Sequence, residues 1–159
     1  MAPEAYRAPL RSRRDDIDAA QTFRRALSLG LCGFGGVLRP APADLAAALR
    51  LAAEQYDERT SARIARFAAV ADGALVWTRA ADGMFWLGRI EGPWRYDKTA
   101  AAAAVDLVHV RRCGWAPRPF LERHTPAAVV ATFRRGGKNF QRIRAESAGP
   151  ESERCWQRH

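Results

Sequence analysis

The chain has 159 residues, of which 48% are hydrophobic and 27% are charged. That balance is typical of one globular domain and argues against disorder along the whole chain. No run approaches the ~20 apolar residues that a membrane span needs, so we expect no membrane partner. The formal net charge is +9, which favours polyanionic partners. The three cysteines are far apart in the sequence, which is typical of reduced thiols, so we expect a cytoplasmic protein.

The two ends of the chain carry Pro, Ser and charge without apolar periodicity. They predict a flexible basic arm at residues 1–14 and a flexible tail at residues 146–159. Between them we expect a single domain of residues 15–145.

The first half of that domain is predicted to be helical. Apolar residues at helical spacing predict one helix that ends at Gly30, a second that begins after Asp44 and a third that begins at Thr60. A glycine-rich turn at residues 31–38 separates the first two helices.

The second half changes to strand patterns. Short runs of β-branched and aromatic residues predict strands at 74–80, 84–91, 94–96, 106–112 and 139–143. The pair Asp82-Gly83 between the first two is typical of a two-residue hairpin turn. The expected architecture is α+β, a small bent antiparallel β-barrel flanked by N-terminal helices.

A two-residue turn at this position also fixes which side chains share a face of the hairpin. The residues placed on one face are Trp77, Arg79, Trp86 and Gly88. An arginine beside an indole, with a glycine opposite a second indole, suits stacking on an unpaired base. Each tryptophan equally suits a place in the core, and both interpretations stay open.

Positive charge is concentrated in two segments. Residues 134–144 hold five cations and no acid, and residues 7–14 hold four arginines. Such clusters predict contacts with phosphates.

Signatures of catalysis are missing from the sequence. It contains no P-loop, no dinucleotide fingerprint and no nucleophile elbow. The three histidines are far apart, and the acidic residues follow no metal-ligand spacing. We therefore expect no enzymatic activity, no cofactor and no metal centre.

Four segments resemble a bacterial module that occurs alone or joined to restriction enzymes. Residues 71–96, ADGALVWTRAADGMFWLGRIEGPWRY, are similar to its G-D-L-V-W-T-R-D-x-x-G-x-Y-Y-L-G-R-V-x-G-x-W-x-Y segment. DLVHVRRCGW at 106–115 resembles its x-x-H-V-R-x-x-x-W strand, and residues 125–143 resemble its basic closing segment. Residues 27–37 resemble its early glycine turn. These modules belong to the PUA-like superfamily, near the EVE and YTH domains.

This resemblance implies a small bent barrel that recognises a modified or flipped base in an aromatic pocket. With the hairpin geometry, it places in the base pocket Gly33, Gly35, Trp77, Trp86, Trp94, Tyr96 and Trp115. With the basic segment, it places on the nucleic-acid backbone Arg79, Arg111, Arg112, Arg134, Arg135, Lys138 and Arg142. One position departs from the family pattern, because Gly36 stands where the family has a tryptophan.

The sequence therefore predicts a nucleic-acid reader that recognises a modified, flipped base, in DNA rather than RNA, in defence against foreign DNA. A nuclease or another effector protein is the expected partner. Two alternatives remain: an RNA-binding module, and a subunit that docks onto another protein through exposed tryptophans. Both nucleic-acid hypotheses predict strong salt dependence of binding, and the docking hypothesis does not.

Overall fold

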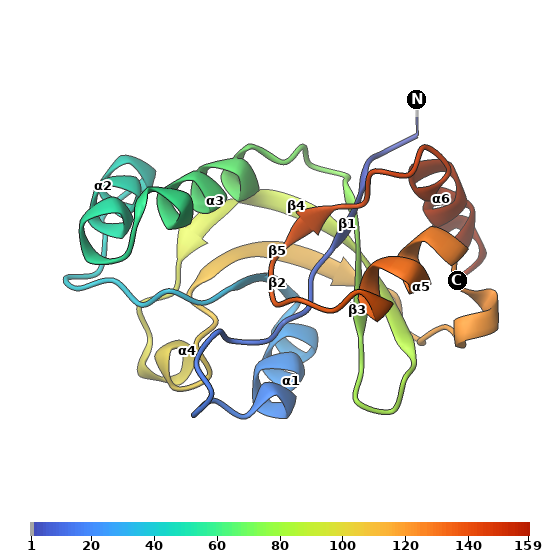
Figure 1. The fold of residues 1–159 in the computed structure, drawn as a ribbon, viewed down its shortest axis with the longest axis horizontal. Coiled ribbons are helices and arrows are strands. Elements are labelled where there is room, and N and C mark those ends of the chain that lie inside the picture. The colour runs from blue at the N-terminus through green and yellow to red at the C-terminus, as the bar shows by residue number, and fades with distance from the viewer. Residues whose placement is uncertain (1) are drawn as a thin grey trace.

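A curved six-stranded sheet organises the chain in the computed structural model, which describes residues 2–159 (Figure 1). The strands are β1 (Ala5–Arg7), β2 (Leu31–Phe34), β3 (Leu75–Arg79), β4 (Phe85–Tyr96), β5 (His109–Trp115) and β6 (Gln141–Arg142). The helices are α1 (Ala19–Leu29), α2 (Leu45–Gln55), α3 (Glu58–Ala69), α4 (Ala100–Ala104), α5 (Ala127–Arg134) and α6 (Ala148–Arg158), with a 3-10 turn η1 (Glu122–His124). The strand order is β2-β5-β4-β3-β1-β6.

The α+β class is confirmed, but the predicted closure into a barrel is wrong. β2 and β6 form the two edges of the sheet, and no pairing joins them within residues 2–159. The chain's first strand, β1, adds to β3 in parallel, and β6 adds beyond it, so the sheet extends instead of closing. The bend comes from β4, whose pairing with β5 shifts register between Glu91 and Arg95.

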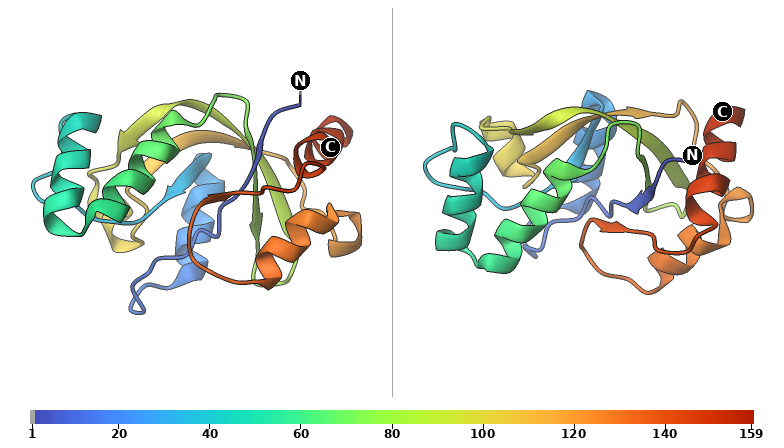
Figure 2. Two further views of the ribbon diagram at one scale, coloured as in Figure 1. Left: turned by 45° about the horizontal axis from the view of Figure 1, so that its top comes forward. Right: turned by 90° about the horizontal axis from the view of Figure 1, so that it is seen from above.

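Both ends of the described chain, residues 2–159, belong to the fold. The predicted flexible arm (1–14) and flexible tail (146–159) are therefore wrong over these residues, and Met1 lies outside them. β1 lies between β3 and β6, and the chain stays buried as far as Leu10. At the other end, α6 packs on β1 and β3 and buries Ser152 and Cys155 (Figures 1 and 2). The residues that these segments bury are mostly small or polar, which is why they gave no apolar pattern.

Aspartate side chains begin three of the helices. Asp18, Asp44 and Asp57 each accept a hydrogen bond from a backbone N–H in the first turn of α1, α2 and α3. The start of α2 is as predicted, whereas Asp57, and not Thr60, caps α3. Gly30 ends α1 as predicted, with a left-handed φ of 65°.

The β3–β4 hairpin closes with a three-residue turn instead of the predicted two-residue turn. The Ala80 N–H donates to the Met84 carbonyl at 2.8 Å, and Gly83 takes the left-handed φ of 86° that ends such a turn. The strand register shifts by one residue as a result. Because side chains alternate along a strand, this shift places Trp86 on the face opposite Trp77.

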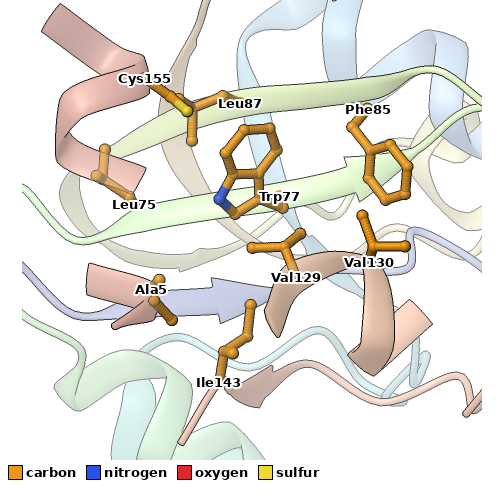
Figure 3. Packing of buried hydrophobic residues seen from close by; sticks show 10 residues of the cluster. Ala5, Leu75, Trp77, Phe85, Leu87, Val129, Val130, Ile143 and Cys155 are labelled. Atoms are coloured by element: carbon orange, nitrogen blue, oxygen red, sulfur yellow. The ribbon is translucent and has the colours of Figure 1, made fainter. Parts of the chain in front are cut away.

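A large buried cluster lies where β1, β3 and β4 pack against α5 and α6 (Figure 3). Trp77 is fully buried within it. Its indole N–H donates to the Ser152 hydroxyl at 2.9 Å, and the Phe120 ring meets it edge-on. Val129 from α5 and Cys155 from α6 belong to the same cluster. Trp77, which the sequence placed in the base pocket, is therefore a core residue.

Candidate functional site

A groove of about 1890 Å³ opens between α3 and the chain that follows α5. Four stretches that are distant in sequence line it, together with Asp106. They are the N-terminal segment, the glycine turn after β2, α3 with the two residues before it, and the stretch from α5 to the residues after β6. Figure 2 shows the N-terminal chain passing between α3 and the α5–β6 connection. The two basic segments singled out in the sequence, at opposite ends of the chain, meet here.

Ten cationic side chains line this groove, against three carboxylates. The N-terminal segment contributes Arg11, Arg13 and Arg14, and α3 contributes Arg59, Arg63 and Arg66. The stretch after α5 contributes Arg135, Lys138, Arg142 and Arg144. The carboxylates are those of Glu4, Asp57 and Asp106. The groove lining is therefore strongly positive.

The α3 arginines form a stripe because they recur at helical spacing. Arg59, Arg63 and Arg66 are four and three residues apart and so share a face, while Ile64 is buried on the other side. At a rise of 1.5 Å per residue the stripe is roughly 10 Å long. None of the three was predicted as a site residue, although the spacing within ERTSARIARF was a signal that could have identified them.

Positive charges crowd one another in the groove. Partial burial, and then the neighbouring Arg13, lower the pKa of Arg63 below its ordinary value. In the same way, burial and then Arg135 lower the pKa of Arg7. The lining thus holds cations close together at some electrostatic cost, which a bound anion would relieve.

Ion pairs compensate three of the ten cations among the residues described. Arg14 pairs with Asp16 at 2.6 Å and Lys138 pairs with Asp15 at 3.5 Å. Arg142 pairs with Glu4, also at 3.5 Å. All three pairs lie at the surface, where an ion pair contributes little and exchanges readily for another anion.

Arg7 is buried and holds the basic loop in place. Its Nη1 donates to the carbonyl oxygens of Thr132 at 2.9 Å and Gly136 at 2.5 Å. Its Nη2 donates to the side chain of Gln141 at 3.0 Å. These bonds tie the end of α5 and the start of β6 to β1, so the cations of the loop between them have a fixed support.

The glycine turn after β2 forms one end of the groove. The Asp106 carboxylate lies behind it and accepts hydrogen bonds from the Gly36 N–H at 3.0 Å and the Ser12 hydroxyl at 2.5 Å. A Cβ at Gly35 would overlap this carboxylate, so only glycine fits there without a shift. Of the two predicted pocket glycines, Gly35 lines the groove, whereas Gly33 packs against the backbone of β5.

Three of the predicted pocket tryptophans are spread over different parts of the sheet. Trp77 is a core residue, so its prediction as a pocket residue is wrong. Trp86 is half-buried on the opposite face of the hairpin. Trp115 is half-buried, and its indole N–H donates to the Leu31 carbonyl at 3.1 Å. The close approach that Gly88 permits is that of the Cys113 sulfur and the Trp115 ring.

Trp94 and Tyr96 do lie together, but the side chain of His109 fills the space beside them. The imidazole stacks on Trp94 with ring centroids 6.0 Å apart and meets Tyr96 edge-on at 5.5 Å. Phe34 packs on it at 5.6 Å, and Nε2 lies 2.9 Å from the Gly36 carbonyl. Burial lowers the pKa of His109 to about 4, so the ring is neutral and its Nε2–H donates to that carbonyl. This aromatic cage therefore encloses the chain's own imidazole.

The predicted backbone-binding residues fall into separate groups. Three of them line the groove, namely Arg135, Lys138 and Arg142. Arg134 and Arg79 lie outside it, and both contact the Glu122 carboxylate, at 3.3 and 3.9 Å. Arg112 is exposed on β5, also outside the groove.

Arg111 is buried, and its prediction as a phosphate contact is wrong. Only 2% of its surface is exposed. Its guanidinium donates to the carbonyls of Phe67, Val70 and Gly92 at 3.0, 2.5 and 2.9 Å, and to the Asp72 carboxylate at 2.8 Å. Two of those carbonyls lie at the C-terminal end of α3, where a cation is favoured. Arg111 therefore anchors α3 to the sheet.

Aromatic rings share the groove with the cations. Tyr6 stacks on Phe140 with centroids 5.1 Å apart, and Phe140 meets Phe67 edge-on at 4.9 Å. Phe34 and Tyr56 line the groove as well. None of these five was predicted as a site residue, because the sequence pattern drew attention to the tryptophans of the hairpin.

Comparison with known proteins yields no relative: no protein-family model, curated protein or solved structure matches the chain. Within residues 2–159 no helix has the length and apolar character to cross a membrane. The same residues contain no group of three or more His, Cys, Asp or Glu side chains placed to hold a metal ion.

Proposed function

We propose that the protein binds nucleic acid in the groove between α3 and the chain after α5. The observation that carries the proposal is the lining of ten cations against three carboxylates. A phosphate backbone is held by such an array of Lys and Arg side chains. Four of the groove's rings are at least partly exposed and offer flat surfaces on which bases stack: Tyr6, Phe34, Tyr56 and Phe140.

The three carboxylates of the groove offset only part of this field, because ten cations face them, and each carboxylate also has a structural partner in the protein. Asp57 accepts two hydrogen bonds from Thr60 at the start of α3. Asp106 holds the glycine turn. Glu4 accepts the hydroxyl of Tyr6 at 2.6 Å in addition to its ion pair with Arg142. Seven groove cations remain without a carboxylate within 4.0 Å in the described chain, so the net field favours an anion.

The resemblance to PUA-like modules supports a finer proposal, that one modified base of DNA is recognised during defence against foreign DNA, with a nuclease or another effector as partner. Trp77 and Trp115 are committed to packing, and the cage around His109 is filled. In this proposal, a recognised base contacts the groove's own rings and the turn at Gly35 instead of the tryptophans.

Fluorescence anisotropy with labelled oligonucleotides, titrated between about 50 and 200 mM salt, tests the proposal. The double variant Arg63→Ala/Arg66→Ala removes two groove cations. We expect it to weaken binding at least ~10-fold for all sequences alike and to lower the salt slope by about 2. A protein that binds neither DNA nor RNA at the lowest salt contradicts the proposal.

A matched control separates the groove from the general charge of the protein. Arg24 and Arg154 are exposed and lie outside the groove. The variant Arg24→Ala/Arg154→Ala loses the same formal charge and should keep nearly the wild-type affinity. Equal losses in the two double variants would point to non-specific attraction. Running each titration with DNA, RNA and modified-base oligonucleotides of one sequence tests the finer proposal and the RNA alternative.

A further inference from the structure

Tyr56 is a large side chain that is exposed at the end of α2. Its exposed fraction is 49%. Two other large hydrophobic side chains within residues 2–159 are similarly exposed, Leu29 at 55% and Leu121 at 38%, and neither lines the groove. Tyr56 therefore presents an exposed aromatic face inside the basic groove.

The ring lies at a junction of two hollows. Beside the groove is a second hollow of about 380 Å³, lined by residues that include Arg39 and Gln55. Tyr56, Arg14 and Val37 line both hollows. The ring is therefore accessible from the groove and from the adjoining space.

The position of the ring is fixed although it is exposed. The Tyr56 hydroxyl donates to the Val37 carbonyl at 2.7 Å, and its backbone N–H donates to the Ala52 carbonyl at 2.9 Å. Burial, and then the nearby Asp106 and Tyr96, raise the pKa of Tyr56, so the hydroxyl keeps its proton at neutral pH. A ring held at both ends loses little freedom when a ligand stacks on it.

Cations line the two hollows at which Tyr56 lies. Arg14 lines the same two hollows, with half of its side chain exposed. The backbone of Arg39 is held by Gln55, which accepts from its N–H at 3.1 Å and donates to its carbonyl at 2.5 Å. Arg59, the first cation of the α3 stripe, follows Tyr56 by three residues. The Tyr56 ring therefore comes directly before the α3 stripe of Arg59, Arg63 and Arg66 in the sequence.

We propose that Tyr56 is the stacking site for an unpaired base of single-stranded nucleic acid, whose phosphates continue along the α3 stripe. The inference rests on the proposed function and adds the strand state. In a duplex the faces of each base are covered by the neighbouring bases, so a protein ring can reach only the base edges in the grooves. An unpaired base offers that face, and stacking is sequence-tolerant because every base has one.

Anisotropy titrations of single-stranded and duplex DNA of one sequence, with wild type and Tyr56 variants, test the inference. Loss of a stacking ring costs roughly 1–3 kcal/mol per base, so Tyr56→Ala should weaken single-strand binding ~10-fold or more. Tyr56→Phe keeps the ring but loses its bond to the Val37 carbonyl, so it should weaken single-strand binding much less than Tyr56→Ala does. Tyr56→Leu keeps apolar bulk without a ring and should resemble Tyr56→Ala. Duplex affinity should change little in all three.

Leu121→Ala is the control, because it removes an exposed apolar side chain outside the groove and should leave both affinities unchanged. Single-strand binding by Tyr56→Ala at wild-type strength would overturn the inference while leaving the proposed groove intact. Failure of wild type to bind any oligonucleotide would instead overturn the proposed function. A mononucleotide that binds as tightly as the oligonucleotide, and needs Tyr56 equally, would show a free-nucleotide site and overturn the strand assignment.

Discussion

Two regions of this protein combine aromatic rings with arginines, and only one of them is open. In the β3–β4 hairpin, Trp77 is covered by α5 and α6, and Arg79 lies over the Phe85 ring and near Glu122. In the groove, the rings and most of the cations line empty space. Both regions combine rings with arginine, so this combination alone does not separate core from candidate site, and the segments that cover each region do.

That covering is set by long-range contacts. The hydroxyl that satisfies the Trp77 indole comes from Ser152, in the segment predicted to be a flexible tail. On the groove side, the N-terminal segment and the loop after α5 lie beside α3 without filling the space between. A local pattern defines which face a side chain occupies, and distant segments define whether that face is buried.

The largest expected effect separates the two regions directly. Trp77→Ala should lower the free energy of unfolding by about 3–5 kcal/mol, because it leaves a large cavity and an unsatisfied Ser152 hydroxyl. Trp86→Ala, at a half-buried position on the opposite face, should cost much less. Chemical denaturation measures both. A Trp77→Ala protein of wild-type stability that has lost oligonucleotide binding would restore the hairpin as the site.

The filled aromatic cage predicts a dependence of stability on pH. The unfolded chain takes up a proton on His109 near pH 6.5, whereas the folded protein does so only near pH 4. Protons therefore favour unfolding between these values, and stability should fall by up to about 3 kcal/mol as the pH drops through this window. The difference between denaturation profiles of wild type and His109→Gln isolates the imidazole. If the stability of the two proteins changed with pH by the same amount, the predicted contribution of the buried His109 would be contradicted.

The two predicted pocket glycines should respond differently to a methyl group. Gly33→Ala places a Cβ against the rigid backbone of β5, and overpacking of this kind costs roughly 1–3 kcal/mol or more. Gly35→Ala meets the Asp106 carboxylate, a side chain that can shift, so its loss of stability should be smaller. Its effect should appear in oligonucleotide affinity, because Asp106 shapes the end of the groove. Equal stability losses with unchanged affinity would remove the glycine turn from the site.

Some features of the fold and of the candidate site could be predicted from the sequence. Helix signals such as Asp44 and Gly30 are local, and the structure confirms them. The pair Asp82-Gly83 predicts a two-residue turn, whereas a three-residue turn forms, and this difference of one residue places Trp86 on the face opposite Trp77. The burial of Arg111 had no local signal, because its partners are carbonyls at the end of α3 and the Asp72 carboxylate.

The smallest expected effect tests whether the groove is strained by its own charge. Arg59 and Arg63 are like charges one helical turn apart, and Arg13 adds to the field at Arg63. Removing one such charge should stabilise the free protein by about 0.2–0.5 kcal/mol, a small value because solvent screens the site.

Arg63→Gln makes that change while keeping a polar side chain on the helix. Thermal denaturation at low salt should show a slight stabilisation that disappears as salt is added, since salt screens the same repulsion. The same variant should bind single-stranded oligonucleotide more weakly, because one phosphate contact is lost. Arg24→Gln, outside the groove, should change neither quantity appreciably. Opposite signs for stability and binding at Arg63 are what a groove built for a polyanion requires, and a variant that loses both would show that Arg63 serves the fold.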